Sequence, residues 1–458
     1  MDKLVNQVGM FFVMVYLAKM LGPETFGLIG MLAIFTSVSK SLVNSGFSQA
    51  LIQRSKYVTN EDLSTVFITN VSIASIIYLI LYLSAPFIAK FYNEPALVGL
   101  SRVLFIVLLI DALSVVSKAI LSIKVDFKSQ AIASFFATLG GTLVAVFMAN
   151  NGYSYWSLVG LTLTRSAISA ALFGFYSNWR PTVNFYESSF SRLFSFGSKL
   201  LVAGLIATTV QNLYAVLIGR FFGATDVGYF TQAHNLTNTL STIISAVFQN
   251  VTYPVMTSVN DDLQRLVSIY EKLIQLTVVV TIPFFAGFAV VAKDFVNVFL
   301  GNDWEQIIPL LMILSFARLL TPLSVINLNI LNAVGRSDLF LKVDLFKLPL
   351  TVAAMFVSIP FGIEGVAWAM LLTVVISFFI NAYYPSKLFG FTIMRQLVFF
   401  VKPGLAAGVM MLVLGFVQFS TPVVTLVAKI LTGIIVYISA ITLLRINIMK
   451  DILLMLKN

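Results

Sequence analysis

The sequence predicts an all-α polytopic membrane protein with about fourteen transmembrane helices, arranged as two lobes of six helices and two further C-terminal helices. Apolar residues make up 59% of the chain and charged residues only 10%, with a mean hydropathy of +0.95. A soluble domain carries roughly a quarter charged residues. Long apolar runs recur between short polar breaks, and basic residues collect in alternate breaks. Most of the surface must therefore face a bilayer.

Each apolar run is long enough to cross a membrane, because about 20 helical residues with a rise of about 1.5 Å each span about 30 Å. In chain order, the expected helices cover residues 2–20, 26–50, 64–89, 96–121, 129–149, 155–177, 199–219, 226–252, 272–299, 306–334, 339–360, 363–385, 396–418 and 423–444.

The basic residues fall mainly on one side of this arrangement if both termini are cytoplasmic. Of the 29 Lys and Arg residues, twenty then lie in cytoplasmic segments and five lie within helices. Only four lie on the outer side, namely Lys19, Lys90, Arg220 and Lys293. Cytoplasmic loops of membrane proteins are enriched in Lys and Arg. The bias therefore supports both the number of spans and an orientation with cytoplasmic termini.

The longest polar break, residues 178–198, separates two groups of six helices that repeat each other weakly. Residues 19–22 with Gly27 match residues 220–223 with Gly228 at an offset of 201. Because six is even, both copies enter the membrane from the same face, which predicts a parallel repeat about an axis along the membrane normal. The expected organisation is an N-lobe at 1–177, a cytoplasmic linker at 178–198, a C-lobe at 199–388, and helices 13 and 14 with a cytoplasmic tail at 389–458.

Five basic residues lie inside the predicted spans, where a charge is costly unless it is paired or hydrated. Arg102 and Lys429 lie near the outer ends of their helices, and we interpret them as side chains that snorkel to the headgroups. Lys40, Arg165 and Arg318 lie deeper, each with polar neighbours at helical spacing. These three either make hydrogen bonds between helices or line a water-filled cationic cavity. A cationic cavity favours an anionic cargo such as a diphosphate, whose oxygens Arg binds bidentately.

Asp111 is the one acid placed among these bases, and it would either neutralise a base on a neighbouring helix or take part in proton coupling. His234, the sole histidine, would either pack between helices or contact the cargo. Asn44 shares a polar stripe with Lys40 and has the same two interpretations as that residue. Three further amides would be either helix contacts or ligands of sugar hydroxyls, namely Gln211, Asn212 and Asn327.

No metal site or cofactor is expected. The chain has no cysteine and a single histidine, which excludes thiolate ligands and His clusters. A coupling ion, H⁺ or Na⁺, is compatible with transport. The basic residues are scattered singly in short loops, so no nucleic-acid partner is expected.

Six short stretches, taken together and in this order, resemble the Wzx-type polysaccharide flippases. These form the lipopolysaccharide and exopolysaccharide branch of the multidrug/oligosaccharidyl-lipid/polysaccharide exporter superfamily. The stretches run from the first to the twelfth expected helix and cover residues 21–31, Ser45-Gly46-Phe47, 62–67, 194–199, 335–340 and Asn381-Ala382-Tyr383-Tyr384.

The resemblance implies two six-helix lobes around a central cationic cavity, in the inner membrane of a bacterium. It implies a cargo of undecaprenyl-diphosphate-linked oligosaccharide, moved from the cytoplasmic to the outer leaflet by alternating access for O-antigen or exopolysaccharide assembly. The implied partners are this lipid-linked oligosaccharide, membrane lipids, and polysaccharide polymerase or export machinery. At Gln232-Ala233 the family often has a basic residue before the alanine, so a cargo contact at that position is not carried over.

Three alternatives remain. A drug/cation antiporter of the same superfamily would favour acidic residues in its cavity, whereas this chain has one intramembrane acid and five bases. A peptidoglycan-precursor flippase fits the composition equally well, but the six stretches disfavour it. A membrane polymerase or glycosyltransferase needs catalytic carboxylates or histidines, usually on a sizeable outer loop. The predicted outer loops are all short, so we expect a transporter and not an enzyme.

Overall fold

The computed structural model describes residues 2–44, 46–182, 184–259 and 262–445. In these residues the chain is helical and forms no strand. Among them, ten helical segments are long and apolar enough to cross a membrane. The chain is therefore an all-α, multi-pass membrane protein. The expected cytoplasmic tail lies largely outside the described residues.

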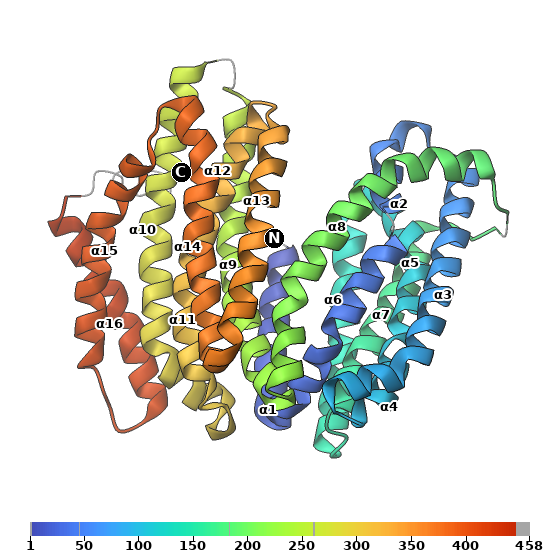
Figure 1. Ribbon diagram of the computed structural model, residues 1–458, viewed down its shortest axis with the longest axis horizontal. Helices are drawn as coiled ribbons and strands as arrows, with labels where there is room; N and C mark the ends of the chain where they lie inside the picture. The colour runs from blue at the N-terminus through green and yellow to red at the C-terminus, as the bar shows by residue number, and fades with distance from the viewer. Residues whose placement is uncertain (1, 45, 183, 260–261, 446–458) are drawn as a thin grey trace. The chain divides into compact units, whose positions relative to one another are not determined.

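The α-helices, labelled in Figure 1, are α1 (Asp2–Asn44), α2 (Phe47–Gln53), α3 (Asn60–Tyr92), α4 (Ala96–Leu104), α5 (Ile106–Ile123), α6 (Phe127–Asn150), α7 (Trp156–Ser177), α8 (Glu187–Phe221), α9 (Ala224–Thr257), α10 (Leu263–Phe295), α11 (Ile307–Leu319), α12 (Thr321–Ala333), α13 (Ser337–Ser358), α14 (Gly362–Phe389), α15 (Ile393–Gly415) and α16 (Pro422–Leu443). Short 3₁₀ or π turns occupy Ser55–Tyr57, Val296–Leu300, Asn302–Trp304 and Ile359–Phe361.

The expected spans coincide with these helices, although fourteen membrane crossings remain a prediction. Helix α1 holds the first two expected spans, which are joined through a kink at Gly22 (φ 73°, ψ 171°) followed by Pro23. Residues 338–389 likewise hold two expected spans in one apolar segment. Helices α8 and α9 are not among the ten apolar segments found in the described residues.

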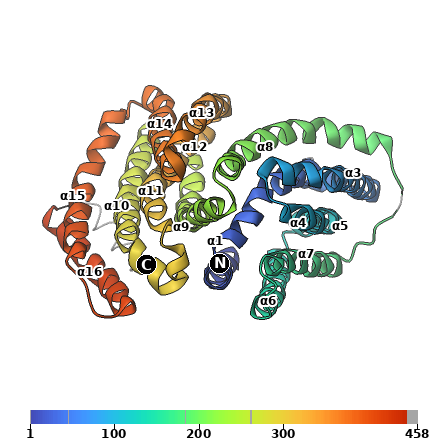
Figure 2. The same cartoon turned by 60° about the horizontal axis from the view of Figure 1, so that its bottom comes forward.

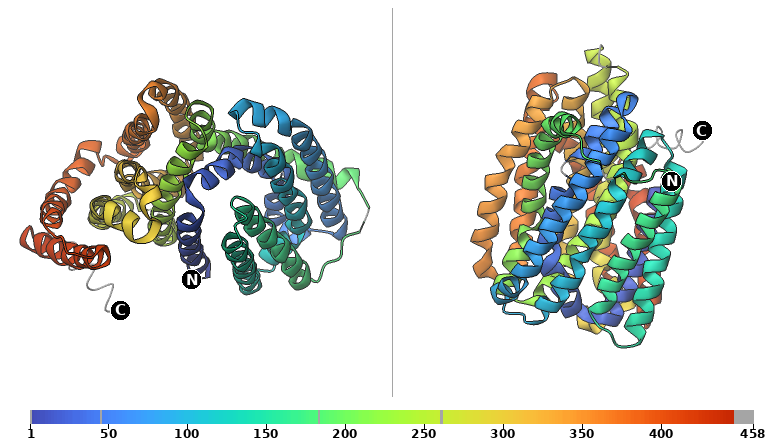
Figure 3. Two further views of the ribbon diagram at one scale, coloured as in Figure 1. Left: turned by 90° about the horizontal axis from the view of Figure 1, so that it is seen from below. Right: turned by 90° about the vertical axis from the view of Figure 1, so that its right-hand side faces the viewer.

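The chain packs as two compact units, residues 1–231 and 232–458. In the first unit α1 packs against α8, α3 against α5, and α6 against α7, which lie side by side in Figures 2 and 3. In the second unit α10 packs against α11, α15 and α16. The division falls inside α9 and not at the expected linker, so the expected lobes remain a prediction.

The linker contains the beginning of a long helix. Helix α8 has 35 residues and begins at Glu187, within the expected cytoplasmic segment. It curves past α3 as a green arc in Figure 2. One continuous helix therefore joins the linker to the seventh expected span.

The repeat-related glycines Gly27 and Gly228 pack backbone to backbone inside the first unit. A Cβ at Gly27 would lie 1.7 Å from the carbonyl oxygen of Ala224, and a Cβ at Gly228 would lie 1.9 Å from that of Pro23. Pro23 and Ala224 are separated by the same offset as the two glycines. The contact is thus reciprocal, with each helix presenting the same two positions to the other.

Candidate functional site

Lys40 and Asp111 form an ion pair between α1 and α5. The Lys40 Nζ lies 2.8 Å from the Asp111 Oδ2, and the two side chains are 39% and 32% exposed. Asp111 therefore neutralises a base on a neighbouring helix, which is one of the two roles that the sequence left open. Because the carboxylate offsets the ammonium charge, Lys40 contributes less positive charge than the sequence alone indicated.

Arg165 lies near the middle of α7 with its side chain exposed. Helix α6 packs closely beside it, since a Cβ at Gly141 would lie 3.1 Å from the Arg165 Cβ. No hydrogen bond or ion pair joins its guanidinium to another described residue. A charge at this depth without a counter-charge in the protein must be satisfied by water or by an anion.

Arg318 lies in the last turn of α11 and is only 9% exposed. Its Nη2 lies 2.7 Å from the Nε2 of His234 on α9. Because a guanidinium only donates hydrogen bonds, Nε2 accepts, and the imidazole is neutral in this contact. A cation also suits the negative end of the helix dipole. The structure thus joins two predicted site residues within the second unit.

Asn327 lies in a fully buried polar network of α10, α12 and α15. The Tyr270 hydroxyl donates to the Asn327 Oδ1. The Gln396 Nε2 donates to the Tyr270 hydroxyl at 3.2 Å, and the Asn327 Nδ2 lies 3.4 Å from the Gln396 Oε1. The three side chains close a ring of hydrogen bonds. Asn327 therefore makes a contact between helices in this structure, which is the first of its two interpretations.

The other three amides belong to the first unit. Asn44 is the exposed last residue of α1. Gln211 is exposed on α8, and the Asn212 Nδ2 donates to the carbonyl oxygen of Thr208 in the preceding turn at 2.8 Å. Among the described residues of the first unit, no hydrogen bond joins these amides to Lys40 or Arg165.

The sequence predicted that Lys429 snorkels to the headgroups, whereas the structure pairs it with a carboxylate on another helix. Its Nζ lies 2.6 Å from the Oδ2 of Asp294 on α10, and the residue is 8% exposed. Asp294 is 135 positions away in the sequence, and no sequence spacing links it to Lys429. Arg102 differs, since its guanidinium lies over the Tyr82 ring at 4.4 Å.

Lys347, which the sequence assigned to a cytoplasmic segment, lies within α13. Its Nζ lies 2.6 Å from the Asp344 Oδ1 and 2.9 Å from the Asn381 Oδ1 on α14. Asn381 belongs to one of the stretches that carry the family resemblance. The hydrogen bond from Lys347 gives Asn381 a structural role between the neighbouring helices α13 and α14.

An apolar groove of about 440 Å³ opens between α10, α15 and α16 in the second unit. Phe284, Val291, Met410 and Ile434 contribute to its walls, and Lys429 is the charged residue that lines it. A groove of this composition suits a hydrocarbon chain. Within the described residues, no group of three His, Cys, Asp or Glu side chains is placed to hold a metal ion.

A model of the polysaccharide biosynthesis protein family matches residues 16–309 of the chain. Among curated proteins, the teichuronic acid biosynthesis protein TuaB of Bacillus subtilis is 26% identical over 84% of this chain and 80% of that protein. The lipopolysaccharide biosynthesis protein WzxC of Escherichia coli is 24% identical over 82% of this chain and 76% of that protein. These similarities confirm the resemblance that the six stretches predicted.

Two solved structures share the fold. The lipid II flippase MurJ in an inward closed conformation superposes with a TM-score of 0.78 at 13% identity, and 98% of each chain is covered. A multidrug resistance transporter of the MATE family gives a TM-score of 0.59 at 14% identity, covering 87% of this chain and 95% of that chain. At these identities the likeness establishes the fold and does not identify a substrate.

Proposed function

Because the chain belongs to the polysaccharide biosynthesis protein family, we propose that it is a flippase for undecaprenyl-diphosphate-linked oligosaccharide. It moves this cargo from the cytoplasmic to the outer leaflet of a bacterial inner membrane, for O-antigen or exopolysaccharide assembly. Two relatives support this proposal by their names, the teichuronic acid biosynthesis protein TuaB and the lipopolysaccharide biosynthesis protein WzxC. The fold shared with transporters supports it as well. In this proposal the protein acts by alternating access and catalyses no covalent chemistry.

The observation that carries the proposal is Arg165, an exposed guanidinium in the middle of a membrane helix. The intramembrane bases Lys40 and Lys429 have carboxylate partners at 2.8 and 2.6 Å. Arg165 has none among the described residues. A diphosphate would supply the missing counter-charge during transport, through the bidentate hydrogen bonds that Arg forms with phosphate oxygens.

Arg318 and Lys40 receive secondary roles in the proposal. The Arg318 guanidinium contacts the imidazole of His234, which carries no opposing charge. Lys40 remains partly exposed beside Asp111, so a phosphate can compete with the carboxylate for its ammonium group. We assign all three cations to the phosphates of the cargo, with Arg165 as the strongest contributor.

The apolar groove between α10, α15 and α16 supports a lipid cargo. Its walls are almost wholly hydrocarbon, which matches a polyprenyl chain and not a free sugar. Burial of hydrocarbon stabilises a complex by about 25 cal/mol per Å². The groove would therefore favour lipid-linked over free oligosaccharide.

The test is surface polysaccharide in cells whose own gene is replaced by variants. Loss of one charge-assisted hydrogen bond of about 1.5–3 kcal/mol weakens binding roughly tenfold or more. We therefore expect Arg165→Ala to lower export at least that much at limiting expression, and Arg165→Lys to retain part of it. Arg102→Ala is the matched control, because Arg102 contacts Tyr82 instead. Normal export by Arg165→Ala at normal protein levels would refute the assigned site.

A further inference from the structure

Three of the six family stretches, which the proposed cargo site does not use, meet in the first unit. Gly46 packs on Gly197, since a Cβ at Gly46 would lie 2.4 Å from the Gly197 carbonyl oxygen. Phe47 lies with its ring centroid 6.0 Å from that of Phe190 and 6.3 Å from that of Phe194. Gly46 and Phe47 come from the stretch at residues 45–47, and Phe194 and Gly197 come from that at 194–199.

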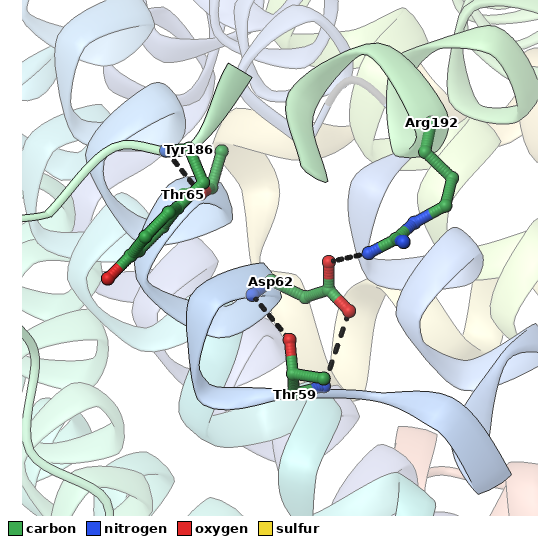
Figure 4. Close-up of polar contacts among 5 residues, drawn as sticks. All are labelled: Thr59, Asp62, Thr65, Tyr186 and Arg192. Atoms are coloured by element: carbon green, nitrogen blue, oxygen red, sulfur yellow. Dashed lines mark hydrogen bonds and ion pairs between the residues drawn. The ribbon is translucent and has the colours of Figure 1, made fainter. Parts of the chain in front are cut away.

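Asp62 of the third stretch forms the polar centre of this region. It lies in the first turn of α3, is 3% exposed, and completes a capping box with Thr59. Its Oδ1 accepts from the Arg192 Nη2 at 2.5 Å, and its Oδ2 accepts from the Thr59 backbone N–H at 3.2 Å. Figure 4 shows the Arg192 guanidinium reaching down from α8 to this carboxylate.

The next residues of the same stretch hold the segment that precedes α8. The Ser64 hydroxyl is hydrogen-bonded to the Thr182 hydroxyl. The Thr65 hydroxyl accepts from the Tyr186 backbone N–H at 3.1 Å, as drawn in Figure 4. The linker is thus hydrogen-bonded to the start of α3 at two points, through Thr182 and Tyr186. Arg192 of α8 makes a third bond to the start of α3, at Asp62.

An apolar layer lies beneath these polar contacts. Leu193 of α8 belongs to one buried cluster with Phe47, Leu63 and Val116, and Trp179 of the linker packs against the cluster. Opening these contacts would expose the cluster to water and would separate the Asp62 carboxylate from the Arg192 guanidinium. Both consequences oppose opening.

We propose that these contacts form a permanent anchor that keeps residues 178–182 and 184–197 fixed to the ends of α2 and α3 throughout the transport cycle. Asp62 and Arg192 are positioning residues that hold the start of α8, and they do not contact cargo. Any movement of α8 during transport is then taken up beyond Gly197. The anchor follows from contacts within the first unit and does not depend on which cargo is carried.

The chain has no cysteine, so a single engineered disulfide tests the anchor cleanly. Ser64 and Thr182 are suitable sites because their hydroxyl oxygens are in contact, which brings the two Cβ atoms near disulfide range. In membranes, Ser64→Cys with Thr182→Cys should cross-link on mild oxidation, whereas each single variant should not. The oxidised protein should transport as fast as the reduced one. Failure to cross-link, or transport that stops on oxidation and returns with reductant, would overturn the proposal.

A rescue experiment distinguishes anchoring from a direct role of Arg192 in transport. Arg192→Gln should slow transport roughly tenfold, because it removes a charge-assisted hydrogen bond. Adding the oxidised Ser64→Cys/Thr182→Cys pair should restore the rate, and reductant should remove the rescue. A cross-linked Arg192→Gln protein that stays slow would contradict an anchoring role. If neither the unchanged protein nor any variant moves the chosen cargo, the cargo proposal fails. The yield of the cross-link still tests the anchor in that case.

Discussion

Lysines and arginines inside the helices of this protein differ in what neutralises them. Lys40 and Lys429 each have a carboxylate on another helix. Arg165 has no such partner among the described residues, and Arg318 contacts an imidazole. The lysines are therefore largely accounted for by contacts within the protein. Arg165 remains the better candidate for binding an anionic cargo.

The Lys40–Asp111 pair predicts a coupled effect on stability. Asp111→Asn leaves an uncompensated cation within the membrane, and Lys40→Met leaves an uncompensated carboxylate. Since both side chains are about a third exposed, each single change should cost only about 1 kcal/mol. The double variant should be more stable than the sum of the two single effects indicates. Thermal unfolding of purified protein measures this, and strictly additive losses would show that the two side chains do not interact.

Substitution of Asn327 should lower the stability of the fold without lowering transport by the folded protein. Asn327→Leu leaves the buried Tyr270 hydroxyl without an acceptor for its proton and the Gln396 Oε1 without its donor, while the Gln396 Nε2 still donates to Tyr270. This should cost about 1–3 kcal/mol of folding free energy. Transport per molecule of folded protein should stay near normal, because Asn327 is fully buried among helices. A large loss of transport without a loss of stability would instead place Asn327 in contact with the cargo.

For individual residues, the sequence showed which charged and amide side chains lie within membrane helices. It did not show which residues on other helices they contact. Depth within an apolar run was sufficient to select Lys40, Arg165 and Arg318. The pairing of Lys429 with Asp294 could not be predicted, because it depends on how α16 packs against α10. The same holds for Asn327, whose ring partners lie on two other helices.

Among the helices, α8 differs most from its expected form. The sequence indicated a span at 199–219 after a polar loop, and the structure begins the helix at Glu187. The segment 187–198 is rich in serine and lacks a long apolar run, so hydropathy assigns it to a loop. Its helical form is stabilised by contacts of Arg192 and Leu193 with other helices, which no local pattern reveals.

At the crossing of α1 and α9, we predict that Gly27 and Gly228 do not tolerate substitution by a larger residue. Gly27→Ala or Gly228→Ala would place a methyl group within 2 Å of a backbone oxygen, and the two helices would have to separate. Overpacking of this kind costs about 1–3 kcal/mol. Both variants should therefore lose stability and transport.

Gly174→Ala is the matched control for this crossing. Gly174 also lies within a helix, and a Cβ there meets nothing within 4 Å. It should therefore be neutral or slightly stabilising, since alanine favours helices over glycine. Equal tolerance at Gly27 and Gly174, measured by thermal unfolding and export, would refute a close crossing.

For the molecule as a whole, composition and periodicity predicted the all-α membrane class, and the six stretches predicted the family. The offset between Gly27 and Gly228 indicated an internal repeat, and their reciprocal contact in the structure agrees with it. The boundary between compact units was not predicted, because the division lies inside the continuous helix α9. A polar break in sequence therefore need not mark a boundary in packing.

The most direct test of the account is transport of a fluorescent undecaprenyl-diphosphate oligosaccharide across liposomes that contain the purified protein. We predict movement between leaflets that exceeds the rate in empty liposomes, falls roughly tenfold or more in Arg165→Ala, and is unchanged in Arg102→Ala. A peptidoglycan precursor and a cationic drug, tested in the same liposomes, should move little. No transport of the oligosaccharide above the rate in empty liposomes, or an Arg165→Ala rate equal to that of the unchanged protein, would contradict the account.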